Sequence, residues 1–312
     1  MTVPGIICSG SIVYDTLVYP FDGSAWGTTR WVKSIEYHVG GNGANTARAM
    51  AILGASVRLV GAVGNDAPAD FVVKELQGSG VSTDFVTRVE APTATTVVLV
   101  NEAGDRQFLH RLGASQDAFS EPLTFTPSLV ENTSHYHFAS LYILPHLRNH
   151  GSEMLRRARA AGLTTSLDTN WDAAGEWMSA LAPCLPELDI LFMNEDEAFM
   201  VTGTRCPATA ARVVQEKGVR TAVMKLGGSG CGIYSDDREI LCPAFPVPVK
   251  DTTGAGDCFV AGFLDARQRG ASWAEAGEFA NAVGALSVQK LGAVTGVISR
   301  AETEAWMSTP LK

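Results

Sequence analysis

Residues 251–264 read DTTGAGDCFVAGFL, a Gly-Ala-Gly turn followed by a long apolar run. The run predicts a buried helix, and the glycines let the turn before it approach a ligand closely. The first N–H groups of a helix have no intrahelical partner and lie at its positive end. The turn of Gly254, Ala255 and Gly256 is therefore predicted to bind a phosphate-like anion.

Asp257 stands in the first turn of this predicted helix, beside the anion site. A carboxylate there can accept the proton of an attacking hydroxyl, and phosphoryl transfer needs only a weak base for that step. A structural interpretation is also open, in which Asp257 merely stabilises the positive end of the helix. The length of the motif favours the catalytic interpretation.

Outward from this turn, strand-like and helix-like patterns alternate along the chain. Strands are predicted at 5–13, 57–63, 135–139, 163–168, 190–194 and 221–226. Helices are predicted at 45–53, 68–77, 149–161, 176–185 and 209–217. Such alternation predicts a mostly parallel sheet with helices on both faces, in which ligands bind beyond the carboxyl ends of the strands.

Two segments, 13–39 and 93–111, break this alternation. Both are rich in strand-forming residues, and the second predicts a hairpin with strands at 95–100 and 106–111 around a turn at 101–104. We expect the two segments to form a small β-sheet inserted into the α/β body. Such a sheet is a candidate lid that excludes water from a reaction, and we favour this interpretation over a decorated sheet edge.

A second glycine turn, GGNGANTARA at 40–49, also leads into a helix of small residues. Asn42 and Asn45 stand at its start and suit a ligand that is rich in hydroxyl groups. The alternative is that Asn45 only caps the helix. The spacing does not match the G-x-G-x-x-G dinucleotide motif, and the chain contains no G-x-x-x-x-G-K-[ST] phosphate loop.

Three further features follow predicted strands. Asn194 and Glu197 can hold Mg²⁺, directly or through water, or can form a capping box, and these interpretations are compatible. The turn KLGGSG at 225–230 can support a nucleotide, or can simply join two strands of a hairpin. Asp15 can accept hydrogen bonds from sugar hydroxyls, although a lone exposed aspartate is the commoner case.

Composition excludes several classes of function. The chain has 312 residues and a formal net charge of −9, without a basic run that could follow a nucleic-acid backbone. No segment approaches the ~20 apolar residues of a membrane helix, and the N-terminus lacks a basic secretory start. The six cysteines form no CxxC pair, which favours reduced thiols in the cytoplasm. HExxH and GxSxG motifs are also absent, which argues against metal-hydrolase and serine-hydrolase functions.

Taken together, these motifs resemble those of the ribokinase-like, or PfkB, family of carbohydrate kinases over nearly the whole chain. GGNGANTARAMAILGASVRLVGAVGNDAPADFVVKELQGSGV at 40–81 is similar to the family's N-terminal signature. DTTGAGDCFVAGFL is similar to its C-terminal signature, and NEDE at 194–197, KLGGSG and ANAVGALSVQKLGA at 280–293 follow the family's order. The resemblance implies one ribokinase-like domain over 1–312, a three-layer α/β/α sandwich with a lid at 13–39 and 93–111.

The resemblance also implies transfer of a phosphoryl group from ATP, with Mg²⁺, to a hydroxyl group that is usually primary. Asp257 matches the family's catalytic base, and 254–256 match its anion hole. The implied nucleotide-binding residues are Asn194, Lys225, Gly227, Gly230 and Asn281, with Glu197 organising Mg²⁺ through water. The implied substrate-binding residues are Asp15, Gly41, Asn42 and Asn45. Asp251 and Thr253 match part of a loop that binds a monovalent cation such as K⁺ in many members.

Departures from the family pattern concern the acceptor. Val13 replaces an asparagine that helps ribokinases to read ribose, and no glutamate follows at 141–143 as it does in ribokinases. Arg106, His110 and Arg111 lie on a predicted hairpin that is similar to those of fructokinase-like and sugar-acid kinases. An arginine there can pair with a carboxylate or with hydroxyls, or can belong to a solvated strand face.

We therefore predict a fructokinase- or ribokinase-like sugar kinase. A nucleoside kinase is the nearest alternative, since Tyr14, Trp26 and Trp31 can stack on a base or can pack the lid. A catalytically silent sugar-binding protein is a third possibility, which the intact GAGD and NxxE motifs disfavour. Because a lid sheet with exposed apolar residues tends to pair with its twin, we also expect a homodimer.

Overall fold

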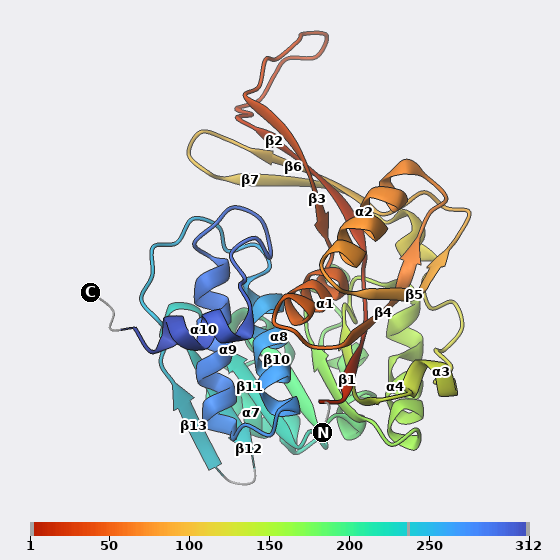
Figure 1. The fold of residues 1–312 in the computed structure, drawn as a ribbon. Helices are drawn as coiled ribbons and strands as arrows, with labels where there is room; N and C mark the ends of the chain where they lie inside the picture. Colours follow the sequence, from red (N-terminus) through yellow and green to blue (C-terminus); the bar gives the residue numbers. More distant parts are fainter. Residues whose placement is uncertain (1–2, 236–237, 310–312) are drawn as a thin grey trace.

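The computed structural model describes residues 3–235 and 238–309, and within them two β-sheets form the framework. The large sheet has nine strands in the order β13-β12-β11-β10-β9-β8-β1-β4-β5 (Figure 1). Their bounds are Gly5–Ser9 (β1), Val57–Val63 (β4), Ser82–Arg88 (β5), Thr133–Ala139 (β8), Thr164–Asp168 (β9), Ile190–Asn194 (β10), Thr221–Lys225 (β11), Cys231–Ser235 (β12) and Arg238–Cys242 (β13).

The large sheet is parallel from β5 to β11, and only β12 and β13 run antiparallel to their neighbours. Successive side chains of a strand point to opposite faces, and β10 shows this clearly. Ile190 and Phe192 belong to one core, whereas Leu191 and Met193 belong to the other. The sheet therefore separates two hydrophobic cores, each of which is covered by helices.

One face is covered by α1 (Asn42–Ile52), α2 (Ala67–Gly78), α8 (Ala255–Gln268) and α9 (Trp273–Ser287), with α10 (Arg300–Met307) beside them. The other face is covered by α3 (Pro127–Val130), α4 (Pro145–Ala160), α5 (Met178–Leu181), α6 (Glu195–Thr202) and α7 (Pro207–Gln215). The predicted three-layer α/β/α arrangement is confirmed. No helix in the described part of the chain is both long and apolar enough to span a bilayer.

The small sheet contains four strands in the order β3-β2-β6-β7 and extends away from the body (Figure 1). They are Val13–Tyr19 (β2), Ser34–Gly40 (β3), Thr95–Val100 (β6) and Arg106–Arg111 (β7). The two central strands, β2 and β6, are parallel although they come from distant parts of the chain. The hairpin of β6 and β7 has the bounds that the alternating pattern predicts.

Several elements differ from expectation near the glycine turns and at the helix ends. The predicted strand 5–13 ends at Ser9, and β2 starts at Val13 in the other sheet. The break occurs at Gly10, where an added Cβ atom would lie 2.9 Å from Cα of Gly43. The predicted helix 176–185 is only α5 followed by a 3₁₀ turn at Leu185–Glu187.

Candidate active site

The starts of α1 and α8 meet at the carboxylate of Asp257. Its Oδ1 accepts a hydrogen bond from Nδ2 of Asn42 at 3.1 Å, and its Oδ2 accepts one from Nδ2 of Asn45 at 2.9 Å. Asp257 is only 5% exposed, and burial raises the pKa of its carboxyl, although the two asparagines and Lys225 oppose that rise. The carboxylate is therefore fixed in orientation and is more basic than an exposed aspartate.

Close backbone packing places α1 against the first strand. Gly41 precedes α1 with φ of 92°, and a Cβ atom there would lie 2.5 Å from the carbonyl oxygen of Ser11. The amide of Asn42 donates to Oγ of Ser11 at 3.1 Å. Glycine is thus required at position 41, and Asn42 is held where its side chain reaches Asp257.

Gly254 is the N-cap of α8 and has φ of 69°, with Ala293 so close that an added Cβ would lie 2.6 Å from its Cβ. The amide of Ala255 donates to the carbonyl of Thr252 at 3.2 Å and is therefore engaged. The amides of Gly256 and Asp257 make no protein hydrogen bond within the described residues. These two N–H groups, at the positive end of α8, are available to an anion.

Lys225, at the end of β11, supplies a positive charge beside this turn. A Cβ atom added to Gly256 would lie 3.2 Å from Nζ of Lys225. Nζ also lies 2.5 Å from Oδ1 of Asp168, at the end of β9. Burial lowers the pKa of Lys225, but Asp168 and Glu197 more than compensate, so the net pKa is raised. Lys225 is therefore held charged next to the 254–256 turn, the candidate anion site.

Asn194 and Glu197 form the predicted capping box at the start of α6. Oδ1 of Asn194 accepts from the amide of Glu197 at 2.8 Å, and Oε2 of Glu197 accepts from the amide of Asn194 at 2.8 Å. Oε2 also accepts a hydrogen bond from Oγ1 of Thr169 at 2.9 Å. Glu197 is 6% exposed and adds negative charge to the surroundings of Lys225 and Asp168.

A pocket of about 370 Å³ opens on one side of the 251–256 segment. Thr252, Ala255 and Gly256 line it, together with Lys225, Gly227, Gly230, Asn281, Phe245 and Val249 among others. The side chain of Asn281 donates to the carbonyls of Cys242 and Pro243, at 2.9 and 3.1 Å. Asn281 therefore holds the 242–245 segment, which forms one wall of this pocket.

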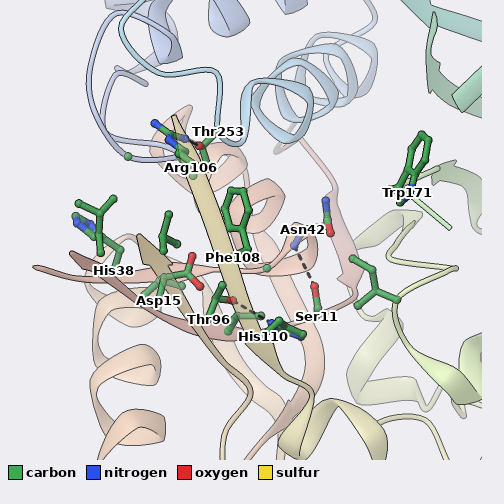
Figure 2. A pocket seen from close by; sticks show the side chains of 18 of the residues that line it. Ser11, Asp15, His38, Asn42, Thr96, Arg106, Phe108, His110, Trp171 and Thr253 are labelled. Carbon is green, nitrogen blue, oxygen red and sulfur yellow. Dashed lines mark hydrogen bonds between the residues drawn. The ribbon is translucent and has the colours of Figure 1, made fainter. Parts of the chain in front are cut away.

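A second pocket, of about 620 Å³, lies on the other side of the same segment and beneath the small sheet (Figure 2). Asp251 and Thr253 line it, so consecutive residues of one turn face two different pockets. Asp15, Gly41 and Asn42 line it too, whereas Asn45 contacts Asp257 without lining it. Burial raises the pKa of Asp15 to about 6, against the lowering effects of Thr96 and His38.

Most of the remaining lining of this larger pocket is apolar. Phe108 of β7 and Trp171, after β9, contribute its largest exposed apolar side chains, with exposed fractions of 58% and 59% (Figure 2). The other apolar lining residues are Val13, Leu17, Val39, Val98, Leu112, Tyr142, Ile143, Ala173 and Ala293. The pocket therefore combines broad apolar walls with several polar side chains, among them Asp15, Asn42 and Arg106.

Arg106, the first residue of β7, crosses from the small sheet to the body (Figure 2). Its guanidinium lies 2.8 Å from Oδ1 of Asp251 and donates to Oγ1 of Thr253. The amides of Thr253 and Gly292 donate to the two oxygens of Asp251 at 2.7 and 2.8 Å. Burial raises the pKa of Asp251, but these hydrogen bonds and Arg106 outweigh it, and the net pKa is lowered.

These contacts do not fit a K⁺ ion held by Asp251 and Thr253. A guanidinium already neutralises the carboxylate, and both carboxylate oxygens accept hydrogen bonds. The resemblance implied a cation at this pair, and in this structure the cation is an arginine of the same chain.

Sequence reasoning missed Asp168, Thr169, Phe108 and Trp171. Asp168 ends a predicted strand and Thr169 follows it directly, so their place at the carboxyl edge was a usable signal. The aromatic residues proposed as base-stacking candidates lie elsewhere. Trp26 and Trp31 are 102% and 89% exposed, and Tyr14 packs against Tyr37 and Phe71.

Residues 6–300 match the model of the pfkB family of carbohydrate kinases. The chain belongs to this family. Its members are phosphotransferases with a hydroxyl group as acceptor. The matched range spans both glycine turns and the strands between them.

Two curated pfkB relatives differ in their acceptors. The chain is 30% identical over 271 residues to the aminoimidazole riboside kinase of Salmonella typhimurium, covering 83% of this chain and 84% of that protein. It is 28% identical over 276 residues to the fructokinase of Vibrio alginolyticus, covering 84% and 89%. One relative is named for a riboside and the other for a free sugar.

Solved structures share the architecture of this pfkB protein. A ribokinase from Arabidopsis thaliana, complexed with ribose and ATP, superposes with a TM-score of 0.87 at 26% identity, covering 99% of this chain and 100% of that chain. A nucleoside kinase from Burkholderia thailandensis, in complex with inosine, has a TM-score of 0.80 at 21% identity, covering 97% and 96%. The ribokinase-like fold is thus confirmed.

Proposed function

We propose that this pfkB protein transfers the γ-phosphoryl group of ATP to a primary hydroxyl of a carbohydrate, with Asp257 as the base. The observation that carries the proposal is that the 251–256 turn separates two pockets immediately before Asp257. ATP would bind in the pocket lined by Gly227, Gly230 and Asn281. The acceptor would bind beneath the small sheet, near Asp15 and Asn42.

The residues at the junction of the two pockets have separate roles in phosphoryl transfer. Asn42, which lines the acceptor pocket, and Asn45 fix the carboxylate of Asp257, and its raised basicity suits it to take the hydroxyl proton. The amides of Gly256 and Asp257 stabilise negative charge on the transferring group, because they are pre-oriented at a helix start. Lys225 adds a charge next to Gly256.

ATP fits the smaller pocket because glycines at 227 and 230 keep backbone close to its surface. Support for this assignment comes from the A. thaliana ribokinase, which was solved with ATP. Mg²⁺ prefers oxygen ligands and is often bound through one or two carboxylates together with substrate phosphates. Glu197 suits the role of that carboxylate and would bind the ion through water. The nucleotide would bring the remaining oxygen ligands and the charge that complete the site. When bound, Mg²⁺ neutralises the phosphates during transfer.

The small sheet covers the acceptor pocket, and we propose that it acts as a lid. Arg106 and Phe108 of β7, with Asp15 of β2, approach the pocket from this sheet. Excluding water there would favour transfer to the acceptor over hydrolysis of ATP.

A nucleoside or another glycoside is a second candidate acceptor, favoured by the apolar walls of the larger pocket. A free sugar offers hydroxyl groups on nearly every carbon, yet Phe108, Trp171 and their apolar neighbours form most of this surface. Aromatic side chains stack on planar rings, as a nucleobase would require. The pfkB relative that acts on a riboside is consistent with this acceptor.

A coupled assay of ADP release tests the proposal. The panel should contain fructose, ribose, 2-keto-3-deoxygluconate, adenosine and inosine, with Asp257→Asn as the control for background. Acceptor-dependent ADP release by the wild-type protein, absent from the variant, is the expected result. ADP release that no acceptor in a broad panel stimulates would instead support a silent sugar-binding protein.

We also propose that two copies pair through the outer face of the small sheet. Ile35, Tyr37 and Leu109 are each more than half exposed, at 54%, 54% and 53%. Register places Tyr37, Thr16, Val97 and Leu109 in one row across the sheet, on the face opposite to Asp15 and Thr96. A largely apolar, exposed face of this kind suits a self-complementary interface with a second copy.

A further inference from the structure

Arg106 joins two parts of the chain that are far apart in sequence. It begins β7 of the small sheet, whereas Asp251 and Thr253 begin the turn that carries the phosphoryl-binding amides. The side chain of Asp251 is only 3% exposed and that of Arg106 is 20% exposed. The ion pair is therefore largely shielded from water, where a charge-assisted contact is stronger than on an open surface.

Both carboxylate oxygens of Asp251 accept hydrogen bonds from backbone amides. The side chain accepts from the amide of Thr253 within its own turn and from the amide of Gly292 across the site. The next residue, Ala293, packs against Gly254, where an added Cβ atom would lie 2.6 Å from Cβ of Ala293. The carboxylate thus joins the 251–254 turn to the 292–293 segment, and Arg106 provides the cation that balances it.

We propose that Arg106 takes the place of a monovalent metal ion at Asp251 and Thr253 and acts as a positioning residue, which holds the phosphoryl-binding turn in place when the small sheet covers the acceptor pocket. This inference rests on the proposed kinase function. It has two consequences: the turn needs no K⁺, and its order depends on contact with the small sheet.

Removing the guanidinium would leave Asp251 buried without its cation, and the 251–254 turn would loosen. The amides of Gly256 and Asp257 continue directly from that turn, so their alignment with the transferring group would suffer. Misplacement of catalytic groups by about 1 Å can cost up to about 100-fold in rate. The loss should therefore appear in kcat, with a smaller effect on the KM for ATP.

The first experiment compares wild-type kcat in potassium, sodium and choline chloride at equal ionic strength. We expect the kcat values in the three salts to agree within about twofold. A difference of about that size corresponds to well under 1 kcal/mol of activation free energy. A several-fold activation by K⁺ over choline would overturn the inference. Absence of acceptor-dependent turnover in every salt would contradict the proposed kinase function instead.

The second experiment uses Arg106→Ala and Arg106→Lys, with Arg30→Ala as the matched control, because Arg30 is an exposed arginine in the connection between β2 and β3. We expect Arg106→Ala to lower kcat by about 10- to 100-fold, and millimolar guanidinium chloride to restore part of it, unlike sodium chloride at the same concentration. A change in acceptor KM alone would show that Arg106 reads the substrate and would overturn the positioning role.

A third measurement does not depend on turnover. Hydrogen exchange of the amides in 251–257 should be faster in Arg106→Ala than in the wild type, and guanidinium should slow it again. Potassium chloride should leave exchange of the wild-type segment unchanged relative to choline chloride. Slower wild-type exchange in potassium chloride would reveal a metal site and would overturn the inference, even if no acceptor were known.

Discussion

Nζ of Lys225 lies 2.5 Å from Oδ1 of Asp168, and the two side chains are 12% and 6% exposed. Lys225 is the last residue of β11 and Asp168 is the last residue of β9, and β10 lies between these two strands in the parallel sheet. Burial raises the pKa of Asp168, and the nearby charges of Glu197 and Asp257 act in the same direction. This pair at the strand ends lies next to the 254–256 turn, because Nζ of Lys225 would lie 3.2 Å from a Cβ atom added to Gly256.

Breaking this pair should destabilise the fold. Lys225→Met leaves the carboxyl of Asp168 buried without its partner, which we expect to cost about 3–5 kcal/mol of unfolding free energy. The double variant Lys225→Met/Asp168→Asn should lose less than the sum of the two single losses. Urea unfolding of all four proteins measures the coupling, and strict additivity would contradict a specific interaction.

Replacing the proposed base should abolish turnover without preventing nucleotide binding. We expect Asp257→Asn to lower kcat by about 10²- to 10⁴-fold, because general-base catalysis contributes about that much. The dissociation constant for ATP, measured by calorimetry, should stay close to the wild-type value. Asp70→Asn, at an exposed carboxyl on α2, is the control. Retention of the wild-type rate by Asp257→Asn would rule out its role as base.

The KM for the acceptor should depend on pH through Asp15. Burial raises the pKa of this carboxyl to about 6, so it becomes protonated as the pH falls through that value. A protonated Asp15 accepts hydrogen bonds from the acceptor less well, and KM should therefore rise below about pH 6. In the unfolded chain the pKa is lower, so protonation favours the folded state and this group does not cause acid unfolding.

Asp15→Asn separates this effect from the titration of Asp257. The variant should lose the acidic rise in KM while keeping the acidic fall in kcat, because the pKa of Asp257 is also raised by burial. Initial-rate measurements at fixed saturating ATP across the acidic range provide both parameters. An unchanged KM profile in the variant would assign the titration to another group.

Phe108 and Trp171 should distinguish a nucleoside from a free sugar. If a planar base stacks on them, Phe108→Ala or Trp171→Ala should raise the KM for the nucleoside by about tenfold, the equivalent of about 1.4 kcal/mol. The KM for ATP should stay the same. Trp26→Ala, at a fully exposed side chain that does not line the pocket, is the control. Unchanged nucleoside KM values would favour a free sugar.

Charge on the outer face of the small sheet should dissociate the proposed dimer. Ile35→Asp/Leu109→Asp places two carboxylates among exposed apolar side chains, and desolvating them in an interface is costly. Sedimentation velocity should show a dimer for the wild type and a monomer for the variant. A wild-type monomer at the concentrations used in assays would contradict the proposal.

Local patterns predicted much of the framework. The hairpin of β6 and β7 has its predicted bounds because alternation and a four-residue turn are both local signals. The N-terminus of α2 follows the same local rule, since Asp66 precedes the helix and its Oδ1 accepts from the amide of Ala69 at 3.0 Å. By contrast, the strand predicted at 5–13 divides between two sheets, because a close contact with a helix that begins over thirty residues later interrupts it.

The candidate site was only partly predictable. Asn42, Asn45 and Asp257 were expected at the site because each lies at a glycine turn that opens a helix. In the structure, each asparagine donates one hydrogen bond to the carboxylate of Asp257. Asp168 was missed although it ends a predicted strand, because no local pattern indicates its pairing with Lys225, which lies 57 positions away. Arg106 was expected as a surface or substrate-facing arginine, and its contact with Asp251 was not expected.

The amino-acid sequence by itself determined the α/β layers, the two glycine turns, the family and the candidate site residues, because periodicity, capping and motif spacing act over a few residues. Only the tertiary structure decided which of those residues meet. Asp257 became buried and oriented when α1 packed against α8, and Asp251 acquired a cation when the small sheet covered the pocket. Those contacts join distant segments, so their energies depend on how the whole chain packs.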